Sequence, residues 1–309
     1  MTDSIVYTIS DLSEYSAESG INLVFSYSNE KRATKLLEHC LEKAYNIVNT
    51  IIIMYNNNDV PVELEKKLEG STKYYIRTTS EPMDFVSQLK AIPKAFWSHQ
   101  LLIDMSCIRI PELFTFLKFI KLQEIQHVDI AYSIPFDYVF YKEPFTSYHS
   151  YNGDLKMYEL LGYSGPGESL EYKDLYMFLG FEGALGLKVS ENCQYTNLIL
   201  VNNLPSFFQK YKDISVINNY QLLQAKHQFL YTPADNPYET YNLLDSIIGE
   251  NDQSICIAPL STKPVALGIC MFALEHDNIR IVYPIPITND YLMDNTLETY
   301  RTNVYAISM

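Results

Sequence analysis

Four short polar segments follow strongly apolar runs of the chain, and they hold most of the side chains that could bind or transform a ligand. Two lie in the first half, at 26–30 and 104–107, and two in the second half, at 180–183 and 259–263. Each is expected to open a helix, whose first N–H groups lack partners within the helix and therefore favour a small anion. The predicted ligand-binding residues are Ser28, Asn29, Ser106, Gly180, Gly183, Ser261, Thr262 and Lys263.

Ser261, Thr262 and Lys263 form the most informative segment, because two hydroxyl groups and one ammonium group stand together at a predicted helix start. Backbone N–H groups and the point charge of Lys263 could hold a phosphate or a carboxylate. Alternatively, Ser261 or Thr262 caps the helix, with Pro264 in its first turn. The two roles are compatible, so the sequence leaves the ligand contact open.

Three carboxylates are the candidate catalytic residues: Glu30, Asp104 and Glu182. Carboxylates around one crevice can act as general acid and base or contact a ribose hydroxyl. The alternative is helix capping and solvated charge. Cys107 begins a predicted helix, where a thiolate would be stabilised, but no histidine lies near it in sequence, which favours a structural role.

The glycines at 180, 183 and 186 follow a predicted strand and open a helix. Glycines at such a turn can let the backbone approach a phosphate, but their spacing is not that of the dinucleotide fingerprint, and helix packing is the preferred explanation. The six histidines show no metal-ligand spacing. We therefore predict neither a metal nor a cofactor.

Apolar runs alternate with helical patterns along the whole chain. In the first half we expect strands at 21–26, 50–55, 73–78, 100–105 and 127–132, and helices at 29–44, 62–68, 82–92 and 111–121. In the second half we expect strands at 174–179, 196–201, 228–231, 254–258 and 278–283, and helices from 183 and at 206–212, 220–225, 237–248 and 263–276. This alternation predicts an α/β fold of two tandem Rossmann-like halves, with mostly parallel sheets and crossover helices.

The last arms of the two halves run in the same order and end in similar tetrapeptides, Tyr132–Pro135 and Tyr283–Pro286, which indicates an internal repeat. We place the first half at residues 1–135 and the second at 174–309. Residues 136–173 are either a linker or a lid over the crevice, and 302–307 is expected to add an edge strand. Since ligands bind where the strand order of such sheets reverses, the four polar segments are expected to face a cleft between the halves.

The arm from Ile255 to Pro284 resembles the ligand-binding arm of the CRISPR-associated Rossmann fold (CARF) sensor family, in which a strand runs into a Gly/Ser-Thr-Lys turn and a helix. This chain reads PLSTKPVALG there, with Leu260 and Ser261 in place of the family's glycine pair. The resemblance implies a nucleotide-type ligand, often a cyclic oligonucleotide, bound by Ser261, Thr262 and Lys263. It also implies a setting in bacterial antiviral defence and, usually, an attached effector domain.

Composition narrows the class of protein. The formal net charge of −14 argues against binding to a nucleic-acid polymer, which needs a basic surface. No apolar run reaches the length of a membrane span, and the acidic N-terminus does not predict a signal peptide. The odd number of cysteines, five, is typical of free thiols in a reducing cytoplasm.

Together these features predict a binding or sensor protein for a small anionic, nucleotide-like ligand held at helix starts. Such a protein would act through a partner protein or as a homo-oligomer. One alternative is a nucleotide-processing hydrolase that uses the three carboxylates. Another is a non-catalytic interaction subunit.

Overall fold

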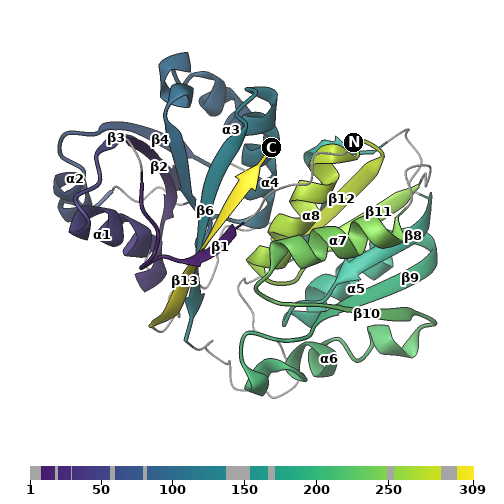
Figure 1. Ribbon diagram of the computed structural model, residues 1–309. Coiled ribbons are helices and arrows are strands. Elements are labelled where there is room, and N and C mark those ends of the chain that lie inside the picture. Colours follow the sequence, from purple (N-terminus) through teal and green to yellow (C-terminus); the bar gives the residue numbers. More distant parts are fainter. Residues whose placement is uncertain are drawn as a thin grey trace. The chain divides into compact units, whose positions relative to one another are not determined.

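The computed structural model describes residues 8–17, 20–28, 30–55, 60–78, 82–136, 154–165, 171–248, 254–286 and 298–309. The chain divides into two compact units (Figure 1). The first combines Met1–Val139 with Met293–Met309, and the second is Phe140–Leu292. Each unit is described by itself.

The first unit contains a seven-stranded sheet in the order β1-β13-β6-β5-β2-β3-β4. Its strands are β1 (Thr8–Asp11), β2 (Ile21–Tyr27), β3 (Ile47–Met54), β4 (Thr72–Arg77), β5 (Gln100–Asp104), β6 (His127–Pro135) and β13 (Thr299–Ser308). The five strands from β2 to β6 are parallel. Their strand order reverses between β2 and β5, the first and fourth of them, as the sequence predicted.

Helices cover both faces of this sheet (Figure 1). They are α1 (Lys35–Glu42), α2 (Val62–Lys67), α3 (Pro82–Lys90) and α4 (Ile110–Leu122), with 3-10 turns η1 (Lys31–Thr34) and η2 (Lys94–Ser98). Residues of α1 and α2 share one buried cluster with Leu23 and Phe25 of β2. Because the central strands are buried on both faces, their sequences are continuous apolar runs rather than alternating ones.

The second unit repeats the topology in a six-stranded sheet of order β10-β9-β8-β11-β12-β7. Its strands are β7 (Leu155–Ser164), β8 (Glu171–Phe178), β9 (Gln194–Asn203), β10 (Gln228–Thr232), β11 (Ile255–Pro259) and β12 (Ile279–Pro286). Its helices are α5 (Gly183–Asn192), α6 (Ile214–Asn218), α7 (Pro237–Ile247) and α8 (Lys263–Glu275), with 3-10 turns η3 (Gln209–Tyr211) and η4 (Leu222–Gln224). Order reverses here between β8 and β11.

The predicted fold class is confirmed: both units are α/β, with mostly parallel sheets and crossover helices. Each fifth parallel strand, β6 or β12, ends in one of the matching tetrapeptides and pairs on its other side with an antiparallel strand. No helix in the described part of the chain is both long and apolar enough to cross a membrane.

The predicted domain boundaries were wrong at two places. Strand β7 and the start of β8 lie within 136–173, so this region is not only a linker. The tail strand β13 belongs to the first unit, and it is not an edge, because β1 pairs with its other side. Strand β7 pairs with β12 and strand β13 pairs with β6, and each partner is an apolar fifth parallel strand whose other side would be unpaired without it. This pairing joins residues that are far apart in the sequence, so a local pattern does not predict it.

Three predicted helices also differ. In place of one helix at 29–44, the described residues form η1 and then α1, while 206–212 and 220–225 contain only the 3-10 turns η3 and η4. Within the predicted linker or lid at 136–173, residues 137–153 and 166–170 lie outside the described part of the chain.

Candidate functional site

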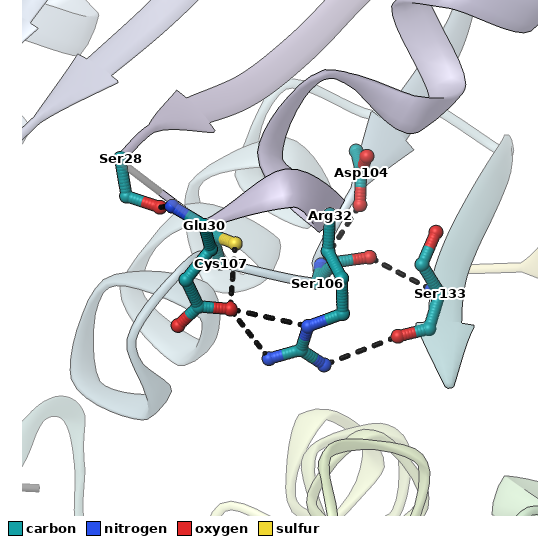
Figure 2. A network of polar contacts seen from close by, with 7 residues as sticks. All are labelled: Ser28, Glu30, Arg32, Asp104, Ser106, Cys107 and Ser133. Carbon is teal, nitrogen blue, oxygen red and sulfur yellow. Dashed lines mark hydrogen bonds and ion pairs between the residues drawn. The ribbon is translucent and has the colours of Figure 1, made fainter. Parts of the chain in front are cut away.

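The candidate site lies in the first unit, where β2 and β5 end side by side and the strand order reverses. Parallel strands bring their carboxyl ends to the same sheet edge, so the loops that follow β2 and β5 meet there. Figure 2 shows the polar side chains that these loops contribute. They are Ser28, Glu30, Arg32, Asp104, Ser106 and Cys107, together with Ser133 of β6.

A buried ion pair forms the centre of this site. The Nε and Nη2 atoms of Arg32 both donate to Oε2 of Glu30, at 3.1 and 2.8 Å. The two side chains are only 8% and 14% exposed. The remaining edge of the guanidinium group donates from Nη1 to the carbonyl oxygen of Ser133, at 3.1 Å. Arg32 is thus held between the loop after β2 and strand β6.

Asp104 and Ser106 are structural parts of the same loop cluster. Oδ1 of Asp104 accepts a hydrogen bond from the N–H of Ser106 at 2.9 Å, which closes the turn after β5. The hydroxyl of Ser106 accepts from the N–H of Ser133 at 2.8 Å. Both residues are buried, Ser106 completely. The predicted ligand contact of Ser106 is therefore not available on the surface of this structure.

Cys107 points at the ion pair. Its thiol donates to Oε2 of Glu30 across 3.5 Å, and the residue is 5% exposed. Glu30 therefore collects three donors on one oxygen, two from Arg32 and one from Cys107 (Figure 2). The structural role preferred for Cys107 on sequence grounds agrees with this burial.

A second arginine stands at the same sheet edge. Arg109 is the N-cap residue of α4, its N–H donates to the Tyr55 hydroxyl at 2.8 Å, and its guanidinium group lies 3.9 Å from the centre of the Tyr55 ring. The chain has five arginines, so two of the five gather at this edge of a strongly acidic protein. Glu112 in the first turn of α4 offsets part of their charge.

The equivalent edge of the second unit is closed by close backbone packing. A Cβ built at Gly180 would lie 2.0 Å from the carbonyl oxygen of Leu260, and one at Gly183 would lie 1.9 Å from that of Asn218. The amide groups of Asn218 and Asn219 donate to the carbonyl oxygens of Phe181 and Gly180. The packing explanation is confirmed for Gly180 and Gly183. The lack of a side chain lets them approach the protein's own backbone, at Leu260 and Asn218.

The hydroxyl groups at the start of α8 also have partners within the second unit. Ser261 donates to Oδ1 of Asn203 and Thr262 to the carbonyl oxygen of Ala234, both at 2.6 Å. Thr262 occupies the N-cap position, but its side chain makes no capping hydrogen bond, so the predicted side-chain capping is wrong. Lys263 is the first residue of α8 and is half-buried.

The predicted residues therefore fall into two groups. Ser28, Glu30, Asp104 and Ser106 come together in the first unit, while Asn29 lies outside the described residues. Gly180, Glu182, Gly183, Ser261, Thr262 and Lys263 belong to the second unit. The three candidate carboxylates are thus shared between the units, and the cleft common to both remains a prediction.

Sequence reasoning missed Arg32 and Arg109. Arg32 stands beside Lys31 on a mixed helical pattern, and Arg109 precedes an apolar helix, so neither has a distinctive motif. Their place in the chain could have indicated them, since Arg32 follows β2 and Arg109 follows β5, the two strands between which the strand order reverses. Among the described residues, no group of three or more His, Cys, Asp or Glu side chains could hold a metal ion.

Comparison with known proteins adds little to this picture. No protein-family model matches the chain, and no curated protein matches it. One solved structure that it resembles is a functionally unknown protein from Pseudomonas aeruginosa, with 8% identity and a TM-score of 0.23 over 84% of this chain and 91% of that one. At this level of similarity the match supports no functional argument.

Proposed function

We propose that the first unit binds a small anionic ligand of the nucleotide class at the carboxyl ends of β2 and β5, with Arg32 as the anion-binding residue. The observation that carries this proposal is the buried ion pair between Arg32 and Glu30, at the point where strand order reverses. Binding, rather than catalysis, is the proposed activity.

The ion pair is costly as a purely structural feature. Two charges removed from water lose hydration that their mutual attraction often fails to repay, so such a pair is weak support for stability. Its position, however, is where parallel α/β sheets bind ligands. A role in binding explains why charge is retained there in place of apolar packing.

The geometry of the pair suggests how an anion would bind. Arg32 presents its Nε and Nη2 atoms to a single carboxylate oxygen of Glu30. That edge of a guanidinium group also matches two phosphate oxygens. Glu30 thus occupies the place that a ligand phosphate would take, and binding would exchange one anion for another without leaving Arg32 unpaired.

Two further features favour an anion over a neutral ligand. Arg109 places a cation at the start of the 13-residue helix α4, whose dipole is also positive at that end. The nucleotide class is supported by the doubly wound topology of the first unit.

Binding can be tested by calorimetry and thermal shift with nucleoside mono- and diphosphates and cyclic dinucleotides. We expect Arg32→Gln to weaken binding at least about tenfold, since a charge-assisted hydrogen bond contributes roughly 1.5–3 kcal/mol. We expect Glu30→Gln to tighten binding, because the competing carboxylate loses its charge. These opposite effects distinguish ligand competition from general damage to the fold.

Arg280→Gln is the matched control. Arg280 is also buried, pairs with Glu159 at 3.3 Å and lies over the ring of Tyr172, but it belongs to the second unit, near the amino ends of β11 and β12. Its substitution should leave affinity unchanged. The proposal fails if the folded wild-type protein binds none of these nucleotides, or if Arg280→Gln weakens binding as much as Arg32→Gln.

A further inference from the structure

The carboxyl end of strand β6 extends beyond β5 and needs other hydrogen-bond partners there. The last backbone bond between the two segments runs from the N–H of Met105 to the carbonyl oxygen of Ala131, at 3.0 Å. Two residues further along β6, Ser133 is completely buried, so water does not reach its N–H and carbonyl groups. Both groups therefore need partners within the protein.

Two side chains take the place of the missing strand. The hydroxyl of Ser106 accepts from the N–H of Ser133 at 2.8 Å, and Nη1 of Arg32 donates to the carbonyl oxygen of the same residue at 3.1 Å (Figure 2). Asp104 holds Ser106 in turn, because its Oδ1 atom accepts from the N–H of Ser106 at 2.9 Å. A chain of hydrogen bonds thus connects the end of β5 to the guanidinium group of Arg32.

We propose that Ser106 is a positioning residue for Arg32, which it holds through the backbone of Ser133 in the orientation that binds the ligand anion. The role rests on the proposed function of the first unit, because Arg32 is the anion-binding residue there. The sequence predicted Ser106 as a direct ligand contact. Its complete burial gives it an indirect role instead.

The orientation of Arg32 follows from the edge of its guanidinium group that Ser133 occupies. The bond from Nη1 to Ser133 leaves Nε and Nη2 directed at Glu30, and these are the two donors that a phosphate would bind. Fixing a long side chain before the ligand arrives avoids the entropy that binding would otherwise lose. Without the Ser106 hydroxyl, the buried N–H of Ser133 lacks its acceptor. The end of β6 would then shift, and the carbonyl oxygen that holds Arg32 would shift with it.

Thr302 of β13 offers a matched control at the same residue of β6. Its hydroxyl oxygen lies 2.9 Å from that of Ser133, and Thr302 is buried as well. This contact involves the side chain of Ser133, whereas Ser106 and Arg32 bind its backbone. Thr302→Val therefore removes a buried hydrogen bond from Ser133 and leaves the two backbone contacts in place.

The position of Arg32 can be measured without any ligand, from the exchange of its Nε–H proton with water in heteronuclear NMR. The Arg32 signal is the one that Arg32→Gln removes. We expect Ser106→Ala to speed this exchange at least about tenfold, because a guanidinium group that is no longer held opens to water more often. Thr302→Val should leave the exchange unchanged. If circular dichroism shows that Ser106→Ala does not fold, Ser106→Cys, whose sulfur is only a weak acceptor, should also speed the exchange.

Calorimetry with nucleoside diphosphates and cyclic dinucleotides measures the consequence for binding. We expect Ser106→Ala to weaken binding by about threefold to tenfold, which is the size of coupling between residues of one hydrogen-bond network. In the Arg32→Gln background, the same substitution should change the affinity little, whereas a merely structural loss would add to that of Arg32→Gln. Thr302→Val should bind like the wild type.

Unchanged Nε–H exchange of Arg32 in a folded Ser106→Ala variant would overturn the positioning role, whether or not the protein binds a nucleotide. An equal change in Thr302→Val would overturn it too, as would a loss of affinity that is the same with and without Arg32. If the wild type binds no nucleotide while Ser106→Ala still speeds the exchange, the proposed function fails and the control of Arg32 by Ser106 stands.

Discussion

Gly180→Ala tests the conclusion that close packing shuts the strand-reversal edge of the second unit. The added Cβ would lie 2.0 Å from the carbonyl oxygen of Leu260. A carbon and an oxygen in contact normally stand roughly 3.3 Å apart, so the two loops would have to separate by about 1.3 Å. The opposing atom belongs to the backbone and cannot rotate away.

The expected cost follows from two opposing effects. Overpacking of a tight site costs about 1–3 kcal/mol, and a backbone obstacle places Gly180→Ala at the upper end. Against this, alanine restricts the unfolded chain and returns up to about 1 kcal/mol. We therefore expect a net loss of about 2 kcal/mol in the free energy of unfolding, which is measurable by urea denaturation followed by far-UV circular dichroism.

Gly186→Ala is the matched comparison, because it changes the unfolded chain in the same way. Its Cβ would meet the side-chain Cδ1 of Leu222 at 2.8 Å and Oδ1 of Asn219 at 3.0 Å, and both side chains can move. We expect a smaller loss than at Gly180. If Gly180→Ala is as stable as the wild type and impairs only ligand binding, the packing argument is refuted and Gly180 becomes a ligand contact.

Three other predictions concern single polar contacts. Glu30→Gln should lower the stability of the first unit by about 3 kcal/mol, because it removes the carboxylate that pairs with the buried Arg32, and the fluorescence of the single tryptophan, at 97, reports it; an unchanged urea midpoint would show that the pair is not buried in solution. Thr262→Val should lower the free energy of unfolding by about 1–2 kcal/mol, since it leaves the carbonyl oxygen of Ala234, which precedes α7, without its hydroxyl donor. Unfolding followed by circular dichroism measures this loss against Thr262→Ser, which keeps the donor and should be near wild type. Ser13→Ala should raise the pKa of Asp11, because hydrogen bonds from the Ser13 hydroxyl and N–H now lower this pKa. The contribution of Asp11 to stability is present at neutral pH and is lost as pH falls through the lowered pKa, so in the variant it should be lost at a higher pH. Carboxyl NMR titration checks this, and an unmoved pKa contradicts it.

Local sequence determined the elements of this protein. The apolar runs that predicted β2, β5, β8 and β11 are the central strands of the two sheets, because only strands buried on both faces need continuous apolar sequence. Their order along the chain, with a crossover helix after each, was enough to predict where strand order reverses. The sequence therefore identified the loops that lie at those points, but it did not predict the contacts that their residues make.

Tertiary structure alone decided what those loops do. Glu30 and Arg32 are two residues apart, yet their burial depends on Ser133 of β6, about a hundred residues further along the chain. Gly180 looks equally suited to a phosphate or to packing until the carbonyl oxygen of Leu260 is in place. Strand β13 likewise joins the first sheet because an edge of β6 is open to it. Periodicity is a local property, whereas burial, pairing and contact belong to residues that only folding brings together.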